Sequence, residues 1–318
     1  MNNRDKKYIS RLTLGTAQLG KMYGIANKTG KPNRAEALEI LRHGFNHGID
    51  SIDTAPGYGE SENLIGEFIE EQKKKGLKLP SIITKISALK LKYGPTFEYV
   101  YDYMKESIKK SIHTMRVNHI DVCLLHSSND MASYEGKAVS CLLKLKEQGY
   151  VKETGVSVYK PEEALKAISL DCFDAIQVPI NLLDHRLINS GIINELYRNN
   201  IKVYARSVFL QGLIFLEPDN LPLYLQDAKE IFKMLKELSN YTGLNPQELA
   251  MLFVRDVAGV EKIVVGCETL DQLKDNLKII NLPELNTHTV EQIRFLFKDI
   301  PEKIINPKKW NQTEYYVL

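Results

Sequence analysis

Four polar side chains in this sequence have the types and spacing to deliver a proton to an oxygen atom that is gaining negative charge. Asp53, Lys85 and His126 each stand at the end of a short apolar segment, and Tyr58 follows in the loop PGYG. A tyrosine hydroxyl is a poor acid at neutral pH, but a nearby ammonium group stabilises its phenolate form. Lys85 can supply that ammonium and Asp53 can keep it charged. His126 can donate a hydrogen bond to the oxygen of the reacting molecule.

Each of these residues taken alone also has a structural explanation. A lone aspartate or lysine at the end of a strand is often structural, and a lone histidine is often a satisfied core residue. A tyrosine in a glycine loop usually serves packing. Burying an unpaired charge in apolar surroundings is costly, however. The four residues together, in this order, therefore favour one shared catalytic site over four unrelated structural roles.

The elements that must position these groups alternate between short apolar strands and amphipathic helices. Strands are expected at 11–15, 48–53, 81–85, 121–126, 153–157, 175–179, 202–207 and 262–266. Helices are expected at 34–48, 61–75, 97–115, 136–149, 161–169, 187–200, 227–243, 245–256 and 270–280, with one more at 289–298. Most of the strands are apolar without strict alternation, which is typical of strands buried on both faces.

Eight strand–helix units predict a (β/α)8 TIM barrel of the α/β class, for which about 250 residues are typical. An open doubly wound sheet is the alternative. The barrel is favoured because polar residues recur at the carboxyl ends of the strands, where the catalytic groups of such barrels lie. We expect a single domain over residues 1–318, with the barrel at about 11–280 and a C-terminal helix and irregular tail at 281–318.

Composition argues against several other classes of protein. The 42 Lys and Arg residues nearly balance the 40 Asp and Glu residues, so a net charge of +2 gives no reason to expect nucleic acid or an anionic membrane as a partner. The sequence has no apolar run long enough to span a membrane and no signal peptide. The four cysteines have neither disulfide nor metal-binding spacing, so we expect a cytoplasmic protein without a bound metal. The oligomeric state does not follow from the sequence.

Several motifs resemble those of the aldo-keto reductases, in the same order along the chain. They are LGTAQLG, IDTAPGYG, ITK, DVCLLH, GVS, IQVPIN and VVGCETLDQLKDNL, which together run from about residue 11 to residue 280. The resemblance implies an NAD(P)H-dependent oxidoreductase that reduces an aldehyde or ketone, a small-molecule carbonyl substrate, to an alcohol. The opening LGTAQLGKMYGIANKTG is similar to that of bacterial members associated with sugar or polysaccharide gene clusters. A sugar-type carbonyl is therefore an expected substrate.

The resemblance also implies roles for individual residues. Tyr58 matches the general acid, Asp53 and Lys85 match the pair that tunes it, and His126 matches the residue that orients the substrate. The residues expected to bind the cofactor are Ser157 and Gln177 at the nicotinamide carboxamide, Arg206 and Ser207 after the seventh strand, and Gly266, Cys267, Glu268, Gln272 and Asn276 at the pyrophosphate and adenosine. A helix N-terminus in the last group favours phosphate on physical grounds as well.

Three departures from the family pattern affect these expectations. Val158 stands where an asparagine commonly follows Ser157, which removes one carboxamide contact. Arg206 stands where many members have an aromatic residue, and a guanidinium can either stack on the nicotinamide or bind an anionic substrate group. Glu268 and Gln272 stand where members that prefer NADPH carry Arg or Lys, so NADH is a plausible cofactor.

Two alternative functions remain open at this point. The first is a Schiff-base aldolase with Lys85 as the nucleophile, although the nearby Asp53 disfavours the neutral amine that such a lysine needs. The second is a non-catalytic regulatory module that binds a nicotinamide nucleotide, although such a module does not need Tyr58. The residues considered for an apolar rim around the substrate are Tyr23, Tyr134, Phe209 and Trp310.

Overall fold

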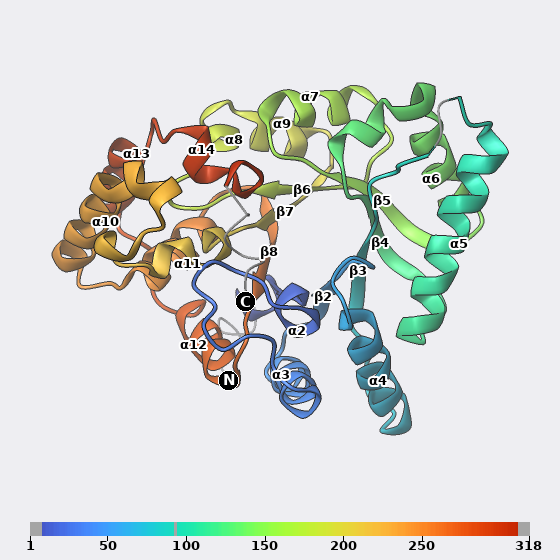
Figure 1. Cartoon of the computed structure of the whole chain (residues 1–318), viewed down its shortest axis with the longest axis horizontal. Coiled ribbons are helices and arrows are strands. Elements are labelled where there is room, and N and C mark those ends of the chain that lie inside the picture. Colours follow the sequence, from blue (N-terminus) through green and yellow to red (C-terminus); the bar gives the residue numbers. More distant parts are fainter. Residues whose placement is uncertain (1–7, 92–93, 311–318) are drawn as a thin grey trace.

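Eight parallel strands close into a barrel in the order of the sequence, with the helices arranged around them (Figure 1). This computed structural model describes residues 8–91 and 94–310. The strands are β1 (Leu12–Gly15), β2 (Ser51–Asp53), β3 (Ser81–Ile86), β4 (Ile120–Leu125), β5 (Val151–Ser157), β6 (Ala175–Pro179), β7 (Lys202–Arg206) and β8 (Val260–Gly266). Gly15 of β1 pairs both with Asp53 and with Gly266, so the sheet has no open edge. The predicted barrel is confirmed, and the doubly wound sheet is excluded.

The helices follow the strands closely along the chain. They are α2 (Ala17–Gly20), α3 (Arg34–Asn46), α4 (Ser61–Lys74), α5 (Phe97–Met115), α6 (Lys137–Glu147), α7 (Pro161–Ser169), α8 (Arg186–Asn189), α9 (Ile192–Arg198), α10 (Lys229–Thr242), α11 (Pro246–Arg255), α12 (Leu270–Ile279), α13 (Thr287–Leu296) and α14 (Glu302–Ile305). Short 3-10 turns are η1 (Ser128–Met131), η2 (Ser133–Gly136), η3 (Leu210–Phe215), η4 (Pro218–Asn220), η5 (Leu223–Ala228) and η6 (Pro307–Lys309).

Local sequence signals explain where several helices begin and end. Asn245 caps α11 by accepting from the backbone N–H of Glu248, whose side chain in turn accepts from the Asn245 N–H. Pro246 occupies the first turn, where no backbone donor is needed. The helix expected at 187–200 is instead two helices, α8 and α9. They are separated at Gly191, whose φ of 76° is left-handed and interrupts the helical backbone.

The polar site at the carboxyl end of the barrel rests on an apolar layer. This layer is a buried cluster of Ile83, Val122, Leu124, Ala175 and Tyr204. Residues two positions apart on a strand point to the same side. Each of the residues Lys85, His126, Gln177 and Arg206 follows a member of the cluster by two positions. The same alternation that fills the barrel interior therefore aims these polar side chains into its mouth.

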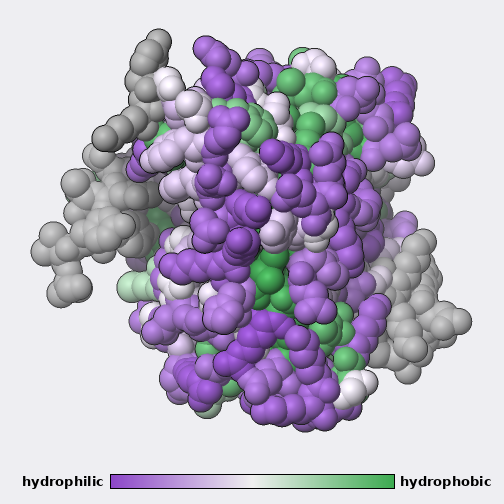
Figure 2. Space-filling model, turned by 90° about the vertical axis from the view of Figure 1, so that its right-hand side faces the viewer, coloured by the Kyte–Doolittle hydropathy of each residue, from purple (hydrophilic) through white to green (hydrophobic). Residues whose placement is uncertain are grey.

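The outer surface is mainly polar on the side of the molecule shown in Figure 2, with smaller hydrophobic patches among the polar side chains. Among the residues that the structure describes, no helix combines the length and the apolar character needed to cross a membrane.

Candidate active site

The centre of the site is a buried ion pair between Lys85 on β3 and Asp53 at the end of β2. The Lys85 Nζ lies 2.7 Å from Oδ1 and 2.9 Å from Oδ2 of Asp53, and it donates a third hydrogen bond of 2.9 Å to the carbonyl oxygen of Thr54. The two residues are 2% and 4% exposed. Burial by itself lowers the pKa of Lys85, but Asp53 and Tyr58 outweigh that effect and raise it above its usual value. The lysine is therefore held as an ammonium.

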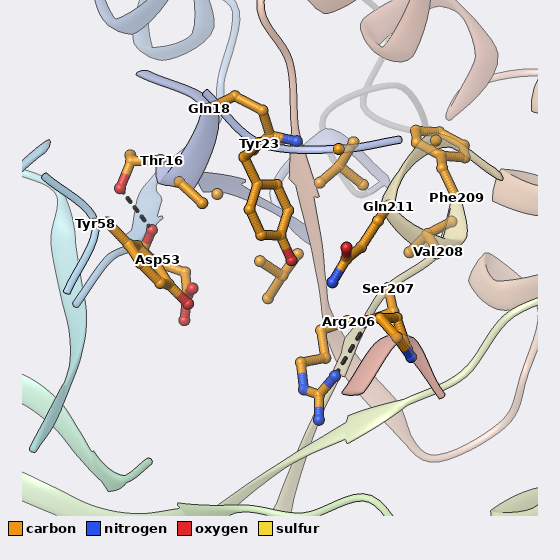
Figure 3. Close-up of a pocket in the computed structure, with 18 of the residues that line it drawn as sticks. Thr16, Gln18, Tyr23, Asp53, Tyr58, Arg206, Ser207, Val208, Phe209 and Gln211 are labelled. Carbon is orange, nitrogen blue, oxygen red and sulfur yellow. Dashed lines mark hydrogen bonds between the residues drawn. The ribbon is translucent and has the colours of Figure 1, made fainter. Parts of the chain in front are cut away.

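Tyr58 lies against this ammonium. The Lys85 Nζ is 5.1 Å from the centre of the Tyr58 ring, and the tyrosine hydroxyl interacts with it. The proximity that the sequence-based hypothesis required between the two residues is present. Tyr58 and Asp53 lie at the same end of the cavity in Figure 3, and both are close to the Lys85 Nζ.

Two glycines allow the Tyr58 loop to pack closely against α2. A Cβ atom added to Gly20 would lie 1.7 Å from the carbonyl oxygen of Tyr58, and one added to Gly59 would lie 2.3 Å from the carbonyl oxygen of Gly20. Gly59 also has a φ of 60°, which other residues rarely adopt. The Gly20 carbonyl accepts a hydrogen bond of 3.2 Å from the Glu60 N–H. The backbone carrying Tyr58 is thus fixed by contacts that only glycine permits.

His126 directly follows β4 and faces the tyrosine ring edge-on, with the two ring centres 6.2 Å apart. Burial lowers the pKa of His126 to about 3, and the charge of Lys85 contributes in the same direction. The imidazole is consequently neutral at physiological pH and can donate one hydrogen bond into the cavity.

Gln177 on β6 contacts the ion pair from the opposite side of the barrel. Its Nε2 donates a hydrogen bond of 2.7 Å to Oδ2 of Asp53. The sequence implied a cofactor contact for Gln177 but gave no sign of this second partner. Ser157, its register neighbour on β5, is also buried and lines the same cavity.

All of these groups line one elongated cavity of about 550 Å³. The predicted catalytic residues Asp53, Tyr58, Lys85 and His126 lie along it. The predicted cofactor residues that line it are Ser157, Gln177, Arg206, Ser207, Gly266, Glu268, Gln272 and Asn276. Cys267 is the exception, because its thiol is buried in the core and is not part of the cavity wall.

The far part of the cavity is built from the start of α12 and the end of β8. The Thr269 side chain caps α12 by accepting from the Gln272 N–H, and the Gln272 Oε1 accepts a hydrogen bond of 2.8 Å from the Glu268 N–H. A Cβ atom added to Gly266 would lie 2.1 Å from Oε1 of Gln18, so the Gln18 side chain occupies the space next to this glycine. A long groove that ends at a glycine and a helix N-terminus suits a dinucleotide with its phosphates.

Two lysines near Glu268 in the sequence, Lys274 and Lys262, do not offset its charge because each pairs with another carboxylate. The Lys274 Nζ pairs with Asp271 at 2.9 Å, and the Lys262 Nζ pairs with Asp50 at 2.7 Å at the opposite end of β8. The charged residue that lines the cavity beside the N-terminus of α12 is therefore Glu268.

Short helices, turns and loops around the barrel mouth supply cavity residues that the sequence analysis did not identify. They include Gln18, Lys21, Tyr159, Gln211 and Gln247. Figure 3 shows Tyr23 projecting into the middle of the cavity, with Gln211 and Arg206 reaching toward the same space. The Ile25 N–H donates to the Gln211 carbonyl oxygen at 2.8 Å, which joins the loop after β1 to the loop after β7. Gln18 lies within a quoted motif, but the loop pairing has no local sequence signal.

Two of the four aromatic residues considered for the rim, Tyr23 and Phe209, line the cavity. The Tyr134 hydroxyl instead bonds to the backbone of Leu89 and Leu91, and it orders the loop after β3. Trp310 is buried in the tail, where its Nε1 donates to the Ile304 carbonyl oxygen at 3.1 Å. Neither of the last two residues is part of the cavity wall.

The closed barrel, the charged lysine beside a tyrosine and the long groove define a class of barrel oxidoreductases that use a nicotinamide cofactor. The chain belongs to the aldo-keto reductase family, whose model, described as Aldo/keto reductase family, matches residues 11–297. It is consequently an NAD(P)-dependent enzyme that acts on small-molecule carbonyl compounds.

Known relatives are similar over nearly the whole chain. The D-arabinose 1-dehydrogenase of Saccharomyces cerevisiae is 24% identical, and the match covers 98% of this chain and 96% of the relative. The NADH-specific methylglyoxal reductase of Escherichia coli is 23% identical, with 86% and 90% covered. A solved aldo-keto reductase of Bacillus halodurans in its holo form superimposes with a TM-score of 0.72 at 20% identity, over 93% of this chain and 95% of that one. This structural similarity supports the assignment of the barrel fold.

Proposed function

We propose that this enzyme reduces an aldehyde or ketone to an alcohol with Tyr58 as the proton donor. The observation that carries the proposal is the contact of Tyr58 with a lysine that two buried acceptors, Asp53 and the Thr54 carbonyl, hold in its charged form. When bound, the reduced nicotinamide supplies a hydride to the carbonyl carbon. The Tyr58 O–H bond breaks as its proton passes to the carbonyl oxygen, and Lys85 stabilises the phenolate that remains.

The neighbouring residues orient the substrate, hold Lys85 and bind the cofactor. Neutral His126 donates a hydrogen bond to the carbonyl oxygen and draws that oxygen toward Tyr58. Asp53 keeps Lys85 protonated and in place. Ser157 and Gln177 hold the carboxamide end of the cofactor, while Gly266 and the N-terminus of α12 hold its phosphates.

The proposal extends to the choice of cofactor, for which NADH is used at least as well as NADPH. Glu268 lines the cavity at the start of α12 and repels a 2′-phosphate, whereas it can accept a hydrogen bond from a 2′-hydroxyl. Lys274 and Lys262 are bound to other carboxylates and do not offset it. The relative from Escherichia coli named as NADH-specific supports this reading.

A sugar-type carbonyl is the proposed substrate class. Two relatives are named for sugars, the D-arabinose 1-dehydrogenase of Saccharomyces cerevisiae and the L-galactose dehydrogenase of Arabidopsis thaliana. Amide side chains such as Gln18 and Gln211 line the cavity and can bond to hydroxyl groups.

The Schiff-base alternative is disfavoured by the state of Lys85. A nucleophilic lysine needs a neutral amine, but the pKa of Lys85 is raised and its nitrogen donates three hydrogen bonds. Turnover of a panel of aldehydes, ketones and sugars with NADH and NADPH in parallel, repeated with Tyr58→Phe, tests the proposed function. Carbonyl reduction that survives this substitution at its normal rate contradicts the role of Tyr58.

A further inference from the structure

Three cations at the mouth of the barrel form no ion pair within the part of the chain that the structure describes. They are Lys21, Arg206 and Lys308. Lys21 donates to the carbonyl oxygen of Gly57, and Arg206 bonds only to uncharged groups. Asp53, the carboxylate in the catalytic part of the cavity, is already bonded to Lys85 and Gln177. The catalytic end of the cavity therefore carries an excess of positive charge.

Two of these cations gather on one aromatic ring. The Arg206 Cζ lies 4.1 Å and the Lys308 Nζ lies 4.0 Å from the centre of the Tyr159 ring. The aromatic ring attracts both, but their charges repel each other, and neither is neutralised. The charge of Arg206 lowers the pKa of Tyr159 even though burial opposes the shift.

Arg206 is fixed in place by its neighbours. Its Nη2 donates to the Val158 carbonyl oxygen at 3.0 Å, and its Nη1 donates to Oγ of Ser207 at 3.1 Å. The side chain therefore loses little further freedom when it binds a ligand. Such a preorganised guanidinium is suited to carboxylate or phosphate oxygens.

Arg206 and the reaction centre line one cavity, and the exposed Lys308 lies at its edge beside Tyr159. Tyr159 and Arg206 line the cavity together with Tyr58 and His126, and Pro307, which precedes Lys308, completes that part of the wall. The charges of Arg206 and Lys308 both act on His126. By contrast, the groove that suits the cofactor phosphates lies at Gly266 and α12, so those phosphates do not account for the cations.

We propose that the substrate carries an anionic oxygen group, a carboxylate or a phosphate, which binds Arg206 and Lys308 beside Tyr159 while the carbonyl faces Tyr58 and His126. The inference rests on the proposed carbonyl reduction and specifies its substrate class. A sugar-type substrate is then a sugar acid or a sugar phosphate.

Paired substrates of similar shape test the proposal. The first pair is 4-carboxybenzaldehyde and its neutral counterpart 4-carbamoylbenzaldehyde, and the second is D-glyceraldehyde 3-phosphate and D-glyceraldehyde. We expect the anionic member of at least one pair to have the higher kcat/KM, and rising ionic strength should reduce that preference. The pair with the larger preference distinguishes a carboxylate site from a phosphate site.

The matched variants are Lys308→Met and Lys309→Met. Lys309 is the neighbouring residue on η6, but its Nζ pairs with Glu302. Lys308→Met should lower the anionic-to-neutral ratio of kcat/KM about two- to fivefold, the usual effect of losing one ion pair that is open to solvent. Lys309→Met should leave the ratio unchanged. Because Lys308 is exposed, its replacement does not endanger folding.

Two outcomes overturn the proposal. One is equal use of the anionic and neutral members of both pairs. The other is a loss of NADH affinity in Lys308→Met with the substrate ratio intact, which assigns the cation to the cofactor. If no aldehyde is reduced at all, the proposed function fails separately. Calorimetry then still tests the anion site. The anion 4-carbamoylbenzoate should bind more tightly than its neutral analogue terephthalamide, and Lys308→Met should abolish this difference in affinity.

Discussion

Gln177 and Asp53, 124 positions apart in the sequence, are joined by a hydrogen bond of 2.7 Å across the barrel mouth. The carboxylate of Asp53 is consequently shared between the amide of Gln177 and the ammonium of Lys85. Gln177, which is proposed to hold the cofactor, is thus bonded directly to the ion pair of Asp53 and Lys85 that is proposed to tune the pKa of Tyr58. Any movement of Gln177 on cofactor binding acts on the carboxylate as well.

Gln177→Leu should therefore affect catalysis as well as cofactor binding. Loss of a hydrogen bond to a charged group typically costs about 1.5–3 kcal/mol, so we expect kcat to fall by about tenfold or more. A double-mutant cycle with Asp53→Asn measures the coupling. Additive effects of the two substitutions on kcat would show that the hydrogen bond has no catalytic role.

Tyr58→Phe removes the proposed proton donor and keeps the ring. We expect kcat to fall by about 10²–10⁴, the usual contribution of a general acid. The dissociation constant for NADH, measured by fluorescence titration, should barely change. A variant with near-normal kcat rejects the assignment.

Lys85→Met leaves the buried carboxylate of Asp53 without its cation. Breaking one side of a buried pair typically costs ~3–5 kcal/mol of folding stability, and activity should fall because the phenolate loses its stabilising charge. Urea denaturation and steady-state kinetics measure the two effects. The double variant Lys85→Met with Asp53→Leu separates them, since it should regain stability without regaining activity. A double variant that regains activity contradicts the role of Lys85.

Glu268→Arg should reverse the choice of cofactor. One gained charge-assisted contact with a 2′-phosphate, together with the lost repulsion, predicts an NADPH dissociation constant lower by about tenfold or more. Asp275→Arg is the matched control, because Asp275 lies on the adjacent helix α12, is exposed and is not part of the cavity wall. If wild-type protein binds NADPH more than about tenfold tighter than NADH, the role given to Glu268 is wrong.

His126 should make folding stability sensitive to acid. Its pKa of about 3 in the folded chain lies below its usual 6.5, so between these values the unfolded chain binds a proton on His126 and the folded chain does not. The stability contributed by this difference is complete above about pH 6.5 and falls as the pH drops toward 3, by up to ~1.4 kcal/mol per pH unit. His126→Gln should therefore lose less stability than wild type between pH 7 and pH 5.5 in urea denaturation. Equal losses in the two proteins would show that His126 titrates normally.

The sequence alone determined the barrel and the polar side chains proposed for catalysis at its mouth. Apolar strands of the right number and spacing, several of them ending in a polar residue, indicated where Asp53, Lys85 and His126 lie, because alternation along a strand fixes which side chains enter the barrel. Local signals also placed helix boundaries, as the cap at Asn245 and Pro246 shows. These features depend on residues that are close together in the chain.

Tertiary structure decided the contacts between distant segments. The bond from Gln177 to Asp53 exists because barrel closure brings β6 and β2 within side-chain reach. The approach of Lys308 to Tyr159, and the burial of Trp310 in the tail, follow from where the C-terminal segment packs. No local propensity or periodicity encodes such contacts, since their free energy comes from burial and charge between elements whose relative positions only the folded chain fixes.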